Sequence, residues 1–307
     1  MKQEMEYIYE IYRQGNIMKA ADKLFVSQPA LSMALRKTEA ELGVRLFDRG
    51  TRPMRLTDAG QIYIRAIEKM QVLEQELDAR LSDLSELRSG VLRIGGSHYI
   101  NSYILAPVLA RFHQLYPGIR IEITEDSSAA LSELLREHRI DLTLNCNDEV
   151  IREFAHRPAF EDQILLAVPA TYPINEENHD YAMTALDIIE GRHHTDACPA
   201  VYLHDFQSLP YIILDQGNNL HERALQMFEE ACFSPDITLS LAQLATAYHM
   251  AAAGYGATLT CDRMVVNADI PLCFYKLRSP AAIRQFYFIL PEADYTPRAV
   301  QELIRMF

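Results

Sequence analysis

The stretch that most constrains the fold lies between residues 15 and 60. Its pattern predicts a helix, a tight turn, a second helix that ends at Gly43, and a short hairpin that carries arginines. Ser27 is expected to cap the second helix, and Pro29 lies in its first turn, where a missing N–H costs little. The chain should therefore begin with a small helical domain.

The second helix of this stretch has two unlike faces. One face is expected to be buried, because apolar or small residues recur on it at helical spacing. Its members are Leu31, Leu35, Thr38 and Leu42. The opposite face is short and polar, and its members are Gln28, Ser32, Met33 and Arg36. A helix of this kind, braced by a neighbouring helix, has the geometry that enters the major groove of DNA.

This stretch resembles the DNA-binding domain of LysR-type transcriptional regulators. The residues that carry the resemblance are Ala20-Ala21, Leu24, residues 26–32 (VSQPALS), Glu39, Leu42-Gly43, Leu46-Phe47, Arg49, Leu56-Thr57 and Gly60. So many matches in register make a specific signal. Met33 and Thr38 depart from the family, which usually has Arg and Leu there. The alternative is a helical subdomain with no role on DNA.

The resemblance implies a winged helix-turn-helix over residues 1–58 that binds double-stranded DNA. Side chains on the polar face of the second helix are expected to contact base edges, and the arginines are expected to contact phosphates. The predicted DNA-binding residues are Lys19, Ser27, Gln28, Pro29, Ser32, Met33, Arg36, Arg49, Arg52 and Arg55.

Charge is divided unevenly along the 307 residues, whose net charge is −13. Residues 1–58 carry ten Lys or Arg and eight Asp or Glu, whereas the rest of the chain carries 19 and 34. This asymmetry confines affinity for nucleic acid to the N-terminal part. Without a run of 18 apolar residues or an apolar signal region, a cytoplasmic protein with no membrane contact is expected. The five cysteines form no CxxC pair, so no disulfide framework is predicted.

Residues 59–89 are expected to form one long linker helix. Apolar residues recur there at the 3–4 spacing of a coiled-coil seam, namely Tyr63, Ala66, Met70, Leu73, Leu77, Leu84 and Leu87. About four heptads of this kind indicate a two-stranded coiled coil, and an amphipathic helix packed on its own domain is the alternative. In the family that the chain resembles, the linker helix dimerises and tetramers are usual.

From residue 90 onward, strands alternate with helices, which predicts an α/β fold with a largely parallel sheet. This order resembles the effector-binding region of the same family, which has the two lobes of periplasmic solute-binding proteins. The matching residues are Pro107, Phe112, Tyr116-Pro117, Leu131, Asp141-Leu142, Pro169 and Gly254-Tyr255-Gly256. The expected effector-binding domain covers 90–307, with lobe I at 90–163 and 268–307 and lobe II at 164–267. Residues 173–207 are longer than the family usually has, and the sequence does not place them.

Polar residues at the predicted strand ends are candidate contacts for a small-molecule effector, because ligands of open α/β sheets bind there. They are Ser97, His98, Ser127, Ser128, Asn145, Cys146, Gln216, Asn218, Gln243, Thr246 and Thr260. Ordinary caps and turns are the alternative for each residue taken alone. Helix N-termini favour carboxylates, so an anionic metabolite is the expected ligand.

Two further clusters of residues are candidate sites. The unplaced segment contains His193, His194, Asp196, Cys198, His204 and Asp205. Imidazole and thiolate suit zinc or copper, but the spacing matches no established zinc pattern. A solvated loop is the stronger interpretation, so neither a metal nor a cofactor is predicted. Cys146 and Cys261 follow strands of opposite lobes, and thiol-based sensing there would need a basic neighbour such as His98 or Arg263.

Catalysis finds no support, because the chain contains no G-x-S-x-G, P-loop or HExxH motif. A two-lobed solute-binding protein or enzyme without a DNA role is the alternative, and fold alone does not separate these. The helix at 28–42 and the arginine hairpin favour a ligand-responsive transcriptional regulator. It would bind a near-palindromic operator as a dimer or tetramer, with RNA polymerase as a further partner. Effector binding between the lobes would change their relative angle.

Overall fold

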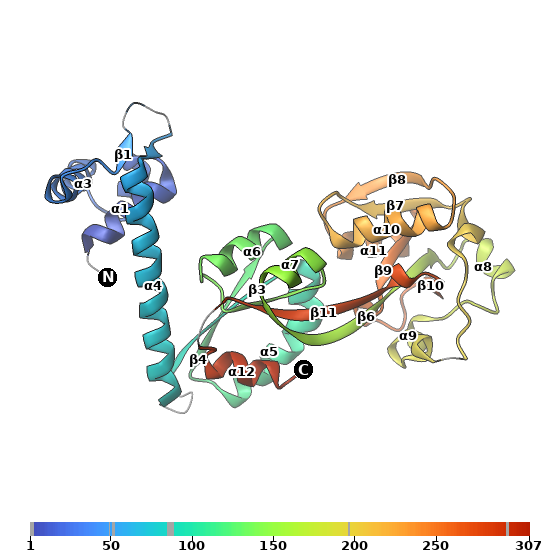
Figure 1. Ribbon diagram of the computed structural model, residues 1–307. Helices are drawn as coiled ribbons and strands as arrows, with labels where there is room; N and C mark the ends of the chain where they lie inside the picture. The colour runs from blue at the N-terminus through green and yellow to red at the C-terminus, as the bar shows by residue number, and fades with distance from the viewer. Residues whose placement is uncertain (1–2, 49, 51–52, 85–88, 196, 293–294) are drawn as a thin grey trace. The chain divides into compact units, whose positions relative to one another are not determined.

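The computed structural model describes the chain except for residues 1–2, 49, 51–52, 85–88, 196 and 293–294. The chain divides into two compact units, Met1–Ser85 and Glu86–Phe307. Each unit has its own elements (Figure 1). Within the described residues, no helix combines the length and the apolar character that a membrane span requires.

The first unit is a helical domain with a two-stranded hairpin and a long final helix. Its elements are α1 (Gln3–Gln14), α2 (Ile17–Lys23), α3 (Gln28–Leu42), β1 (Phe47–Asp48), β2 (Arg55–Leu56) and α4 (Asp58–Leu84). The core gathers residues of α1, α2, α3, the hairpin and α4, including Ile8, Leu31 and Ile67. A Cβ on Gly60 would lie 2.0 Å from the carbonyl oxygen of Leu46. Glycine therefore allows α4 to pass close to the hairpin.

The buried stripe of α3 differs from the prediction at its C-terminal end. The first three expected members are buried, but Leu42 is 45% exposed. Glu39 is buried instead, and its Oε1 accepts hydrogen bonds from the backbone N–H groups of Leu46 (2.9 Å) and Phe47 (3.4 Å). The helix thus ends in a polar contact that holds the start of the hairpin.

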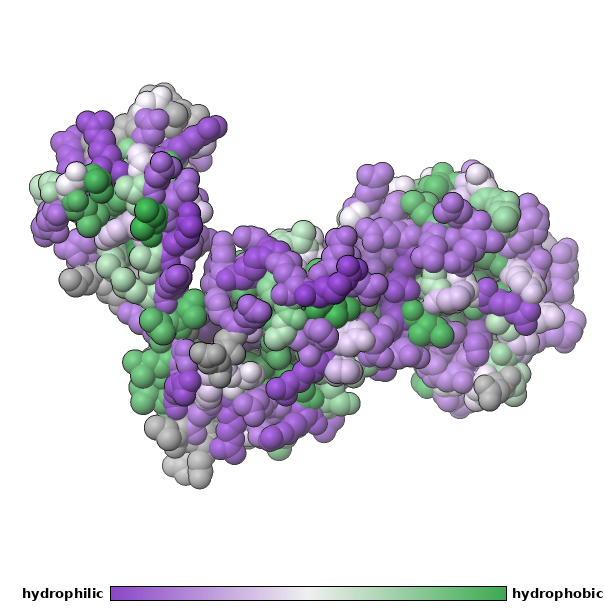
Figure 2. All heavy atoms as spheres, viewed as in Figure 1, coloured by the Kyte–Doolittle hydropathy of each residue, from purple (hydrophilic) through white to green (hydrophobic). Residues whose placement is uncertain are grey.

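The C-terminal half of α4 exposes hydrophobic side chains on its surface (Figure 2). They are Met70, Leu73, Leu77 and Leu81, with 41%, 64%, 56% and 56% of their surface exposed. Earlier in the helix, Ile64 and Ile67 belong to the core of the unit. The predicted seam is therefore exposed where it leaves the domain. The side chain of Leu84 and all of Leu87 lie outside the described residues.

The second unit is a two-lobed α/β domain. Its strands are β3 (Gly90–Gly96), β4 (Ile119–Glu125), β5 (Leu142–Asn145), β6 (Ala155–Pro169), β7 (Pro210–Leu214), β8 (Asp236–Leu241), β9 (Ala257–Cys261), β10 (Leu272–Lys276) and β11 (Ile283–Leu290). The strand order is β4-β3-β5-β11-β6-β9-β7-β8, and β10 also pairs with β6. Residues 155–163 of β6 pair with β11, and residues 164–167 pair with β9. One strand therefore passes from lobe I into lobe II (Figure 1).

Helices cover both sides of the strands in lobe I, with α5 and α12 on one side and α6 and α7 on the other (Figure 1). The helical elements of the second unit are η1 (Ile100–Leu105), α5 (Ala106–Leu115), α6 (Ser128–Arg136), α7 (Asp148–Glu153), α8 (Ile174–Glu177), α9 (Ala185–Ile189), η2 (Arg192–His194), η3 (Leu203–Phe206), α10 (Asn219–Glu230), α11 (Leu244–Ala252), η4 (Asp262–Met264), η5 (Pro280–Ala282) and α12 (Arg298–Ile304). The main core runs through both lobes.

Strand β10 was predicted in lobe I, within residues 268–307, and this part of the prediction is wrong. Its residues, from Leu272 to Lys276, pair antiparallel with 165–169 of β6 in lobe II. The chain returns to lobe I only at β11. Strand periodicity reveals which side chains are buried but not which neighbour a strand pairs with, and the long β6 offers partners in both lobes. The antiparallel strands β6, β10 and β11 also make the sheet mixed rather than largely parallel.

Residues 173–207, which the sequence left unplaced, form α8, α9, η2 and η3 in lobe II. Isolated bridges join Met183 to Phe274 and Val201 to Leu277, so the segment lies against β10 and the residues after it. Met183, Val201 and Phe206 are buried. The insertion is therefore a packed part of the lobe and contributes to its core.

Candidate nucleic-acid interface and ligand cleft

The helices α2 and α3 begin at capped N-termini. Asn16 Oδ1 accepts hydrogen bonds from the backbone N–H groups of Met18 (2.8 Å) and Lys19 (3.2 Å). Ser27 Oγ accepts one from Ala30 (3.3 Å). Gly43 ends α3 with a φ of 71°, in the left-handed region. These caps fix the limits of α3 and so the face that it presents to solvent.

The predicted DNA-contacting residues within the described chain are accessible. All of them are exposed except Ser32, which is half-buried. Gln28 Nε2 donates a hydrogen bond to Ser32 Oγ at 2.9 Å, one helical turn further on. Met33 is 69% exposed. The first turns of α3 thus present an amide, a hydroxyl and a thioether side by side.

Two of the predicted phosphate contacts, Arg49 and Arg52, lie outside the described residues. Arg55 is exposed on β2, opposite Asp48 in the hairpin. Arg36 is exposed on α3. The hairpin and α3, which belong to the same unit, therefore each carry an exposed cation.

Phe25 was missed by the sequence reasoning. It lies in the turn between α2 and α3, is 96% exposed, and has a φ of 55°. The turn is closed by hydrogen bonds from the N–H of Phe25 to Asp22 O (3.3 Å) and from the N–H of Val26 to Ala21 O (3.0 Å). A bulky residue in the left-handed region costs roughly 1–2 kcal/mol, and an exposed ring regains nothing by burial. Phenylalanine has no turn preference that would have signalled this position.

A cavity of about 430 Å³ lies in the second unit, and its lining comes from both lobes. Nine of the predicted effector contacts line it, namely Ser97, His98, Ser127, Ser128, Asn145, Cys146, Gln216, Asn218 and Gln243. Thr246 and Thr260 are not part of this lining within the described residues. Thr246 is exposed on α11, whereas Thr260 is fully buried and donates to Met264 Sδ at 3.7 Å. The structure thus brings most of the predicted set to one cavity.

Two helix N-termini at the cavity carry side-chain caps. Ser127 Oγ accepts from Ala130 N (3.3 Å) at α6, and Asn218 Oδ1 accepts from Leu220 N (2.9 Å) at α10. Gln243, at the start of α11, makes no capping hydrogen bond with the described residues. Each cap satisfies one of the free backbone N–H groups at its helix N-terminus and leaves the others available.

Carboxylates also line the cavity, and the sequence reasoning missed them because it looked for hydroxyl and amide groups. They are Glu125, Asp126, Asp215 and Glu222. His98 Nδ1 lies 3.5 Å from Glu125 Oε2. Arg284 reaches the cavity but is only 4% exposed. Acidic groups therefore outnumber basic ones around this space.

Arg284, on β11, is held by a buried network with residues of β6 and β9 and with Tyr99, which precedes η1. Its Nε and Nη2 donate to Asp162 Oδ1 (2.8 Å) and Oδ2 (2.5 Å). Tyr99 donates to Asp162 Oδ2 at 2.8 Å, and Arg284 Nη2 lies 2.8 Å from Cys261 Sγ. Burial opposes the charge of Arg284, but the paired carboxylate of Asp162 holds its pKa above the ordinary value, so the guanidinium stays charged. Burial raises the pKa of Tyr99, which keeps its proton.

The two cysteines considered for redox sensing are both buried thiols. Cys146 lines the cavity and donates to Asn219 Oδ1 at 3.2 Å, whereas Cys261 packs against Arg284. Burial raises the pKa of both thiols. A protonated thiol is a poor nucleophile, so the geometry does not favour thiol-based sensing.

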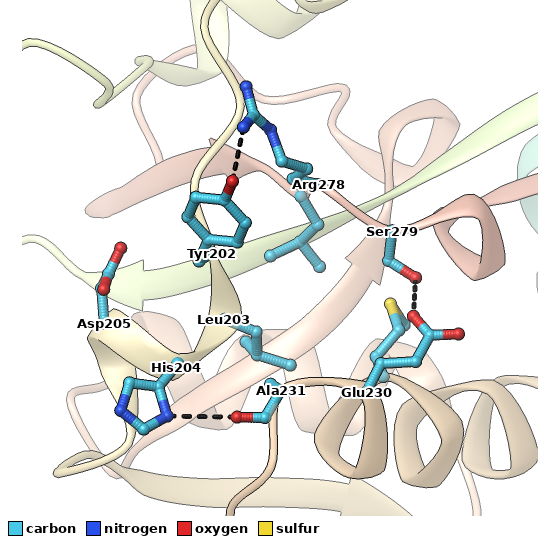
Figure 3. A pocket seen from close by; sticks show the side chains of 10 residues that line it. Tyr202, Leu203, His204, Asp205, Glu230, Ala231, Arg278 and Ser279 are labelled. Carbon is cyan, nitrogen blue, oxygen red and sulfur yellow. Dashed lines mark hydrogen bonds between the residues drawn. The ribbon is translucent and has the colours of Figure 1, made fainter.

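A second cavity, of about 360 Å³, lies within lobe II (Figure 3). Figure 3 shows His204 beside the carbonyl of Ala231, with its Nδ1 3.1 Å from that oxygen. Arg278 Nη1 donates to the hydroxyl of Tyr202 at 2.6 Å. These contacts hold the polar groups of the lining against one another. Part of the polar lining of this cavity is therefore already hydrogen-bonded within the protein.

The six residues weighed as metal ligands do not all come together. His204 and Asp205 line the second cavity, and Cys198 Sγ contacts Met183 Sδ at 3.4 Å. Asp196 lies outside the described residues. His193 is buried rather than solvated, with 2% of its surface exposed, and both His193 and His194 approach Asp262. The solvated-loop interpretation is therefore wrong for His193.

Comparison with protein families finds two matches that together span nearly the whole chain. Residues 3–61 match the model of the bacterial regulatory helix-turn-helix protein, lysR family. Residues 85–186 and 189–307 match the LysR substrate binding domain.

Curated relatives and solved structures agree with these matches. An uncharacterized HTH-type transcriptional regulator of Bacillus subtilis, YcgK, is 28% identical over 98% of this chain and 93% of its own length. A probable RuBisCO transcriptional regulator of Chlorokybus atmophyticus is 34% identical, over 54% of each chain. Full-length OxyR from Pseudomonas aeruginosa has a TM-score of 0.65 at 21% identity, covering 99% of this chain and 96% of that one. Full-length CbnR in complex with its target DNA has a TM-score of 0.64 at 16% identity, covering 100% and 98%.

Proposed function

Because this chain belongs to the LysR family of transcriptional regulators, we propose that α3 reads operator DNA and that the cavity between the lobes binds the effector. The observation that carries the first part is the capped, exposed N-terminal half of α3. Gln28 there donates a hydrogen bond to Ser32 at 2.9 Å, and both side chains are in position to reach base edges. The protein is a transcriptional regulator rather than an enzyme.

A dimer joined along α4 would place two copies of α3 on two half-sites of a near-palindromic operator. The exposed leucines of α4 support this arrangement, because they would be buried in a coiled coil. The same dimers can pair into tetramers. The protein would act on DNA in the cytoplasm, with RNA polymerase as the partner that receives the signal.

The DNA-reading role is tested by selecting duplexes from a random pool with the full-length protein and comparing two variants on the selected site. Gln28→Ala should relax the preference at one position of each half-site, at a cost of about 1–3 kcal/mol. Arg36→Ala should weaken binding to all duplexes alike and reduce the salt dependence by about one unit of slope per half-site. The two losses differ because one side chain reads bases and the other holds phosphate.

Lys37→Ala is the matched control for these variants. Lys37 is a cation on the same helix, but its Nζ pairs with Glu4 (3.6 Å) and Glu41 (3.9 Å). It should keep wild-type affinity. An unchanged base preference in Gln28→Ala would contradict the reading role of α3.

The charges around the cavity favour an effector with a positively charged group. Four carboxylates line the space, and the nearby guanidinium of Arg284 is already paired with Asp162. The expectation of an anion rested on helix N-termini, of which those of α6 and α10 are capped. The N–H groups at the start of α11 would still donate hydrogen bonds to a carbonyl or carboxylate oxygen of the same ligand. A zwitterionic amino acid meets both requirements, and a simple amine meets the first.

Thermal-shift screening of the full-length protein against amines, amino acids and dicarboxylates tests this assignment, because a ligand raises apparent stability by mass action. Ligands with an ammonium group should raise Tm, and Glu222→Gln or Gln216→Ala should reduce the shift. Thr246→Val should bind as the wild type does, since Thr246 lies outside the lining. Stabilisation by dicarboxylates alone would overturn the ligand class, and an effect of Thr246→Val alone would move the site.

A further inference from the structure

Two histidines of the inserted segment and one aspartate from the end of β9 converge on a single point in lobe II. His193 and His194 end η2, and Asp262 begins η4 directly after β9. His193 Nε2 lies 3.1 Å from Asp262 Oδ2, and His194 Nε2 lies 3.4 Å from the same oxygen. One ligand atom from each side chain fits within a group whose atoms all lie within 4.8 Å of one another.

These separations are compatible with metal ligands around one ion, and the 3.1 Å contact of His193 with Asp262 is also a hydrogen-bond distance. Zinc binds imidazole nitrogen at about 2.0–2.1 Å and carboxylate oxygen at about 2.0–2.2 Å, which sets neighbouring tetrahedral ligands about 3.3 Å apart. Both nitrogen–oxygen distances here lie close to that value. The other carboxylate oxygen, Asp262 Oδ1, accepts the backbone N–H of Arg263 at 2.7 Å, which fixes the orientation of the carboxylate.

Burial keeps two of the three side chains away from solvent. The side chains of His193 and Asp262 are 2% and 5% exposed. Nδ1 of His193 is buried and has no hydrogen-bond partner among the described residues. Buried polar atoms are nearly always satisfied, and an exception calls for an explanation such as a bound water or ion. Nδ1 is not the ring nitrogen that contacts Asp262, so this exception concerns the surroundings of the ring rather than the ligand atom Nε2.

The surrounding structure holds the three side chains in place. Thr184 and Asp187 form a capping box at the start of α9, and Asp187 Oδ1 also accepts from Arg192 Nη1 at 3.1 Å. Gly191, with a φ of 78°, turns the chain from α9 into η2. Arg263, which follows Asp262 in the sequence, donates to the carbonyl of Glu161. Its guanidinium is therefore engaged by the backbone.

We propose that His193, His194 and Asp262 form a binding site for a divalent transition-metal ion of the zinc class. Two imidazoles and one carboxylate are ligands that such ions accept, with a fourth position left for water or a further ligand. The side chain of His194 is 55% exposed, which gives the ion a path from solvent. A bound ion ties η2 to the end of β9, next to Cys261 and the Arg284 network.

The proposal is tested on the full-length protein, freed of affinity tags and treated with a chelator. Zn²⁺ is titrated in competition with a chromophoric chelator, and Co²⁺ serves as a spectroscopic probe whose visible absorption is intense only in four-coordinate sites. The wild type should bind one equivalent of Zn²⁺ more tightly than any remaining sites. Its Tm should rise with Zn²⁺, because the ion binds the folded state.

His194→Gln is the primary variant, because this exposed side chain can be replaced without leaving a hole in the core. It should weaken Zn²⁺ binding by at least about 100-fold, since even changes outside the ligand set cost 10–100-fold. The intense Co²⁺ spectrum should also disappear. Asp262→Asn, with its fold checked by circular dichroism, should have the same effect.

His179→Gln is the matched control, because His179 Nε2 lies 3.2 Å from Asp180 Oδ1 in an exposed histidine–aspartate contact. It should bind Zn²⁺ as the wild type does. Binding that is unchanged in His194→Gln, or lost equally in His179→Gln, would overturn the proposal. So would a wild type without a specific Zn²⁺ equivalent, which would leave the three side chains as a hydrogen-bonded cluster. None of these results depends on the DNA or effector assignments.

Discussion

Arg284 and Asp162 are register partners on the antiparallel strands β11 and β6, and their side chains form a buried two-point ion pair. Their side chains are 5% and 0% exposed. This ion pair lies near the end of the β11–β6 ladder, because β6 pairs with β9 from Ile164 onward. It therefore fixes the strand that connects the lobes at the point where it leaves lobe I.

Removal of one member of this pair should destabilise the domain severely. Asp162→Asn leaves the guanidinium of Arg284 buried without its counter-charge, which costs about 3–5 kcal/mol. The double variant Asp162→Asn with Arg284→Met should recover much of that loss, because no unpaired charge remains. Urea unfolding followed by circular dichroism gives both values, and a single variant as stable as the wild type would contradict the role of the pair.

We expect Phe25 to serve a contact at the protein surface, because it does not stabilise the fold. Asparagine tolerates the left-handed region better than a bulky residue does, so Phe25→Asn should raise the free energy of unfolding by roughly 0.5–1 kcal/mol. If the exposed ring contacts DNA, the same variant should bind the selected operator less tightly. Anisotropy titrations and thermal unfolding measure the two effects. A loss of stability would show that the strain at Phe25 is compensated within the folded domain.

The helical domain was largely predictable because its signals are local. Ser27, Gly43 and the apolar spacing of α3 fix a helix from a few neighbouring residues, and the structure places caps at these positions. The prediction that Leu42 is buried was wrong, because the end of the buried stripe depends on a tertiary contact. Glu39 reaches the backbone of Leu46 and Phe47, and no helical periodicity anticipates a buried carboxylate.

The cavity could be predicted only in part. Polar residues at strand ends were found from the general geometry of α/β sheets, and nine of them line one space. The acidic part of the lining was not predicted, because Glu125 and Glu222 resemble ordinary surface charges in the sequence. The contact between His193 and Asp262 involves residues that are 69 positions apart in the sequence. Such contacts follow from the packing of the insertion against the lobe, which no local pattern encodes.

His138 should make stability depend on pH near neutrality. Burial holds its pKa below the ordinary value of 6.5, so the unfolded chain binds more protons than the folded chain just below that pH. Stability therefore falls as pH drops through this window, and His138→Gln removes the contribution. The stability of the wild type relative to this variant should decrease between about pH 7.5 and 5.5. His113→Gln, at an exposed position of α5, is the control, and a difference that does not change with pH would contradict the assignment.

The exposed leucines of α4 should be required for assembly. Leu73→Glu combined with Leu77→Glu would place four carboxylates in a two-fold seam, and an unpaired buried charge costs roughly 3–5 kcal/mol. The dimer dissociation constant should therefore rise more than about 100-fold, and operator binding should fail with it. Gln71→Glu adds a carboxylate on another face of α4 and should leave the oligomer intact. Light scattering and circular dichroism separate loss of assembly from loss of fold, and an undisturbed oligomer in the double variant would place the interface elsewhere.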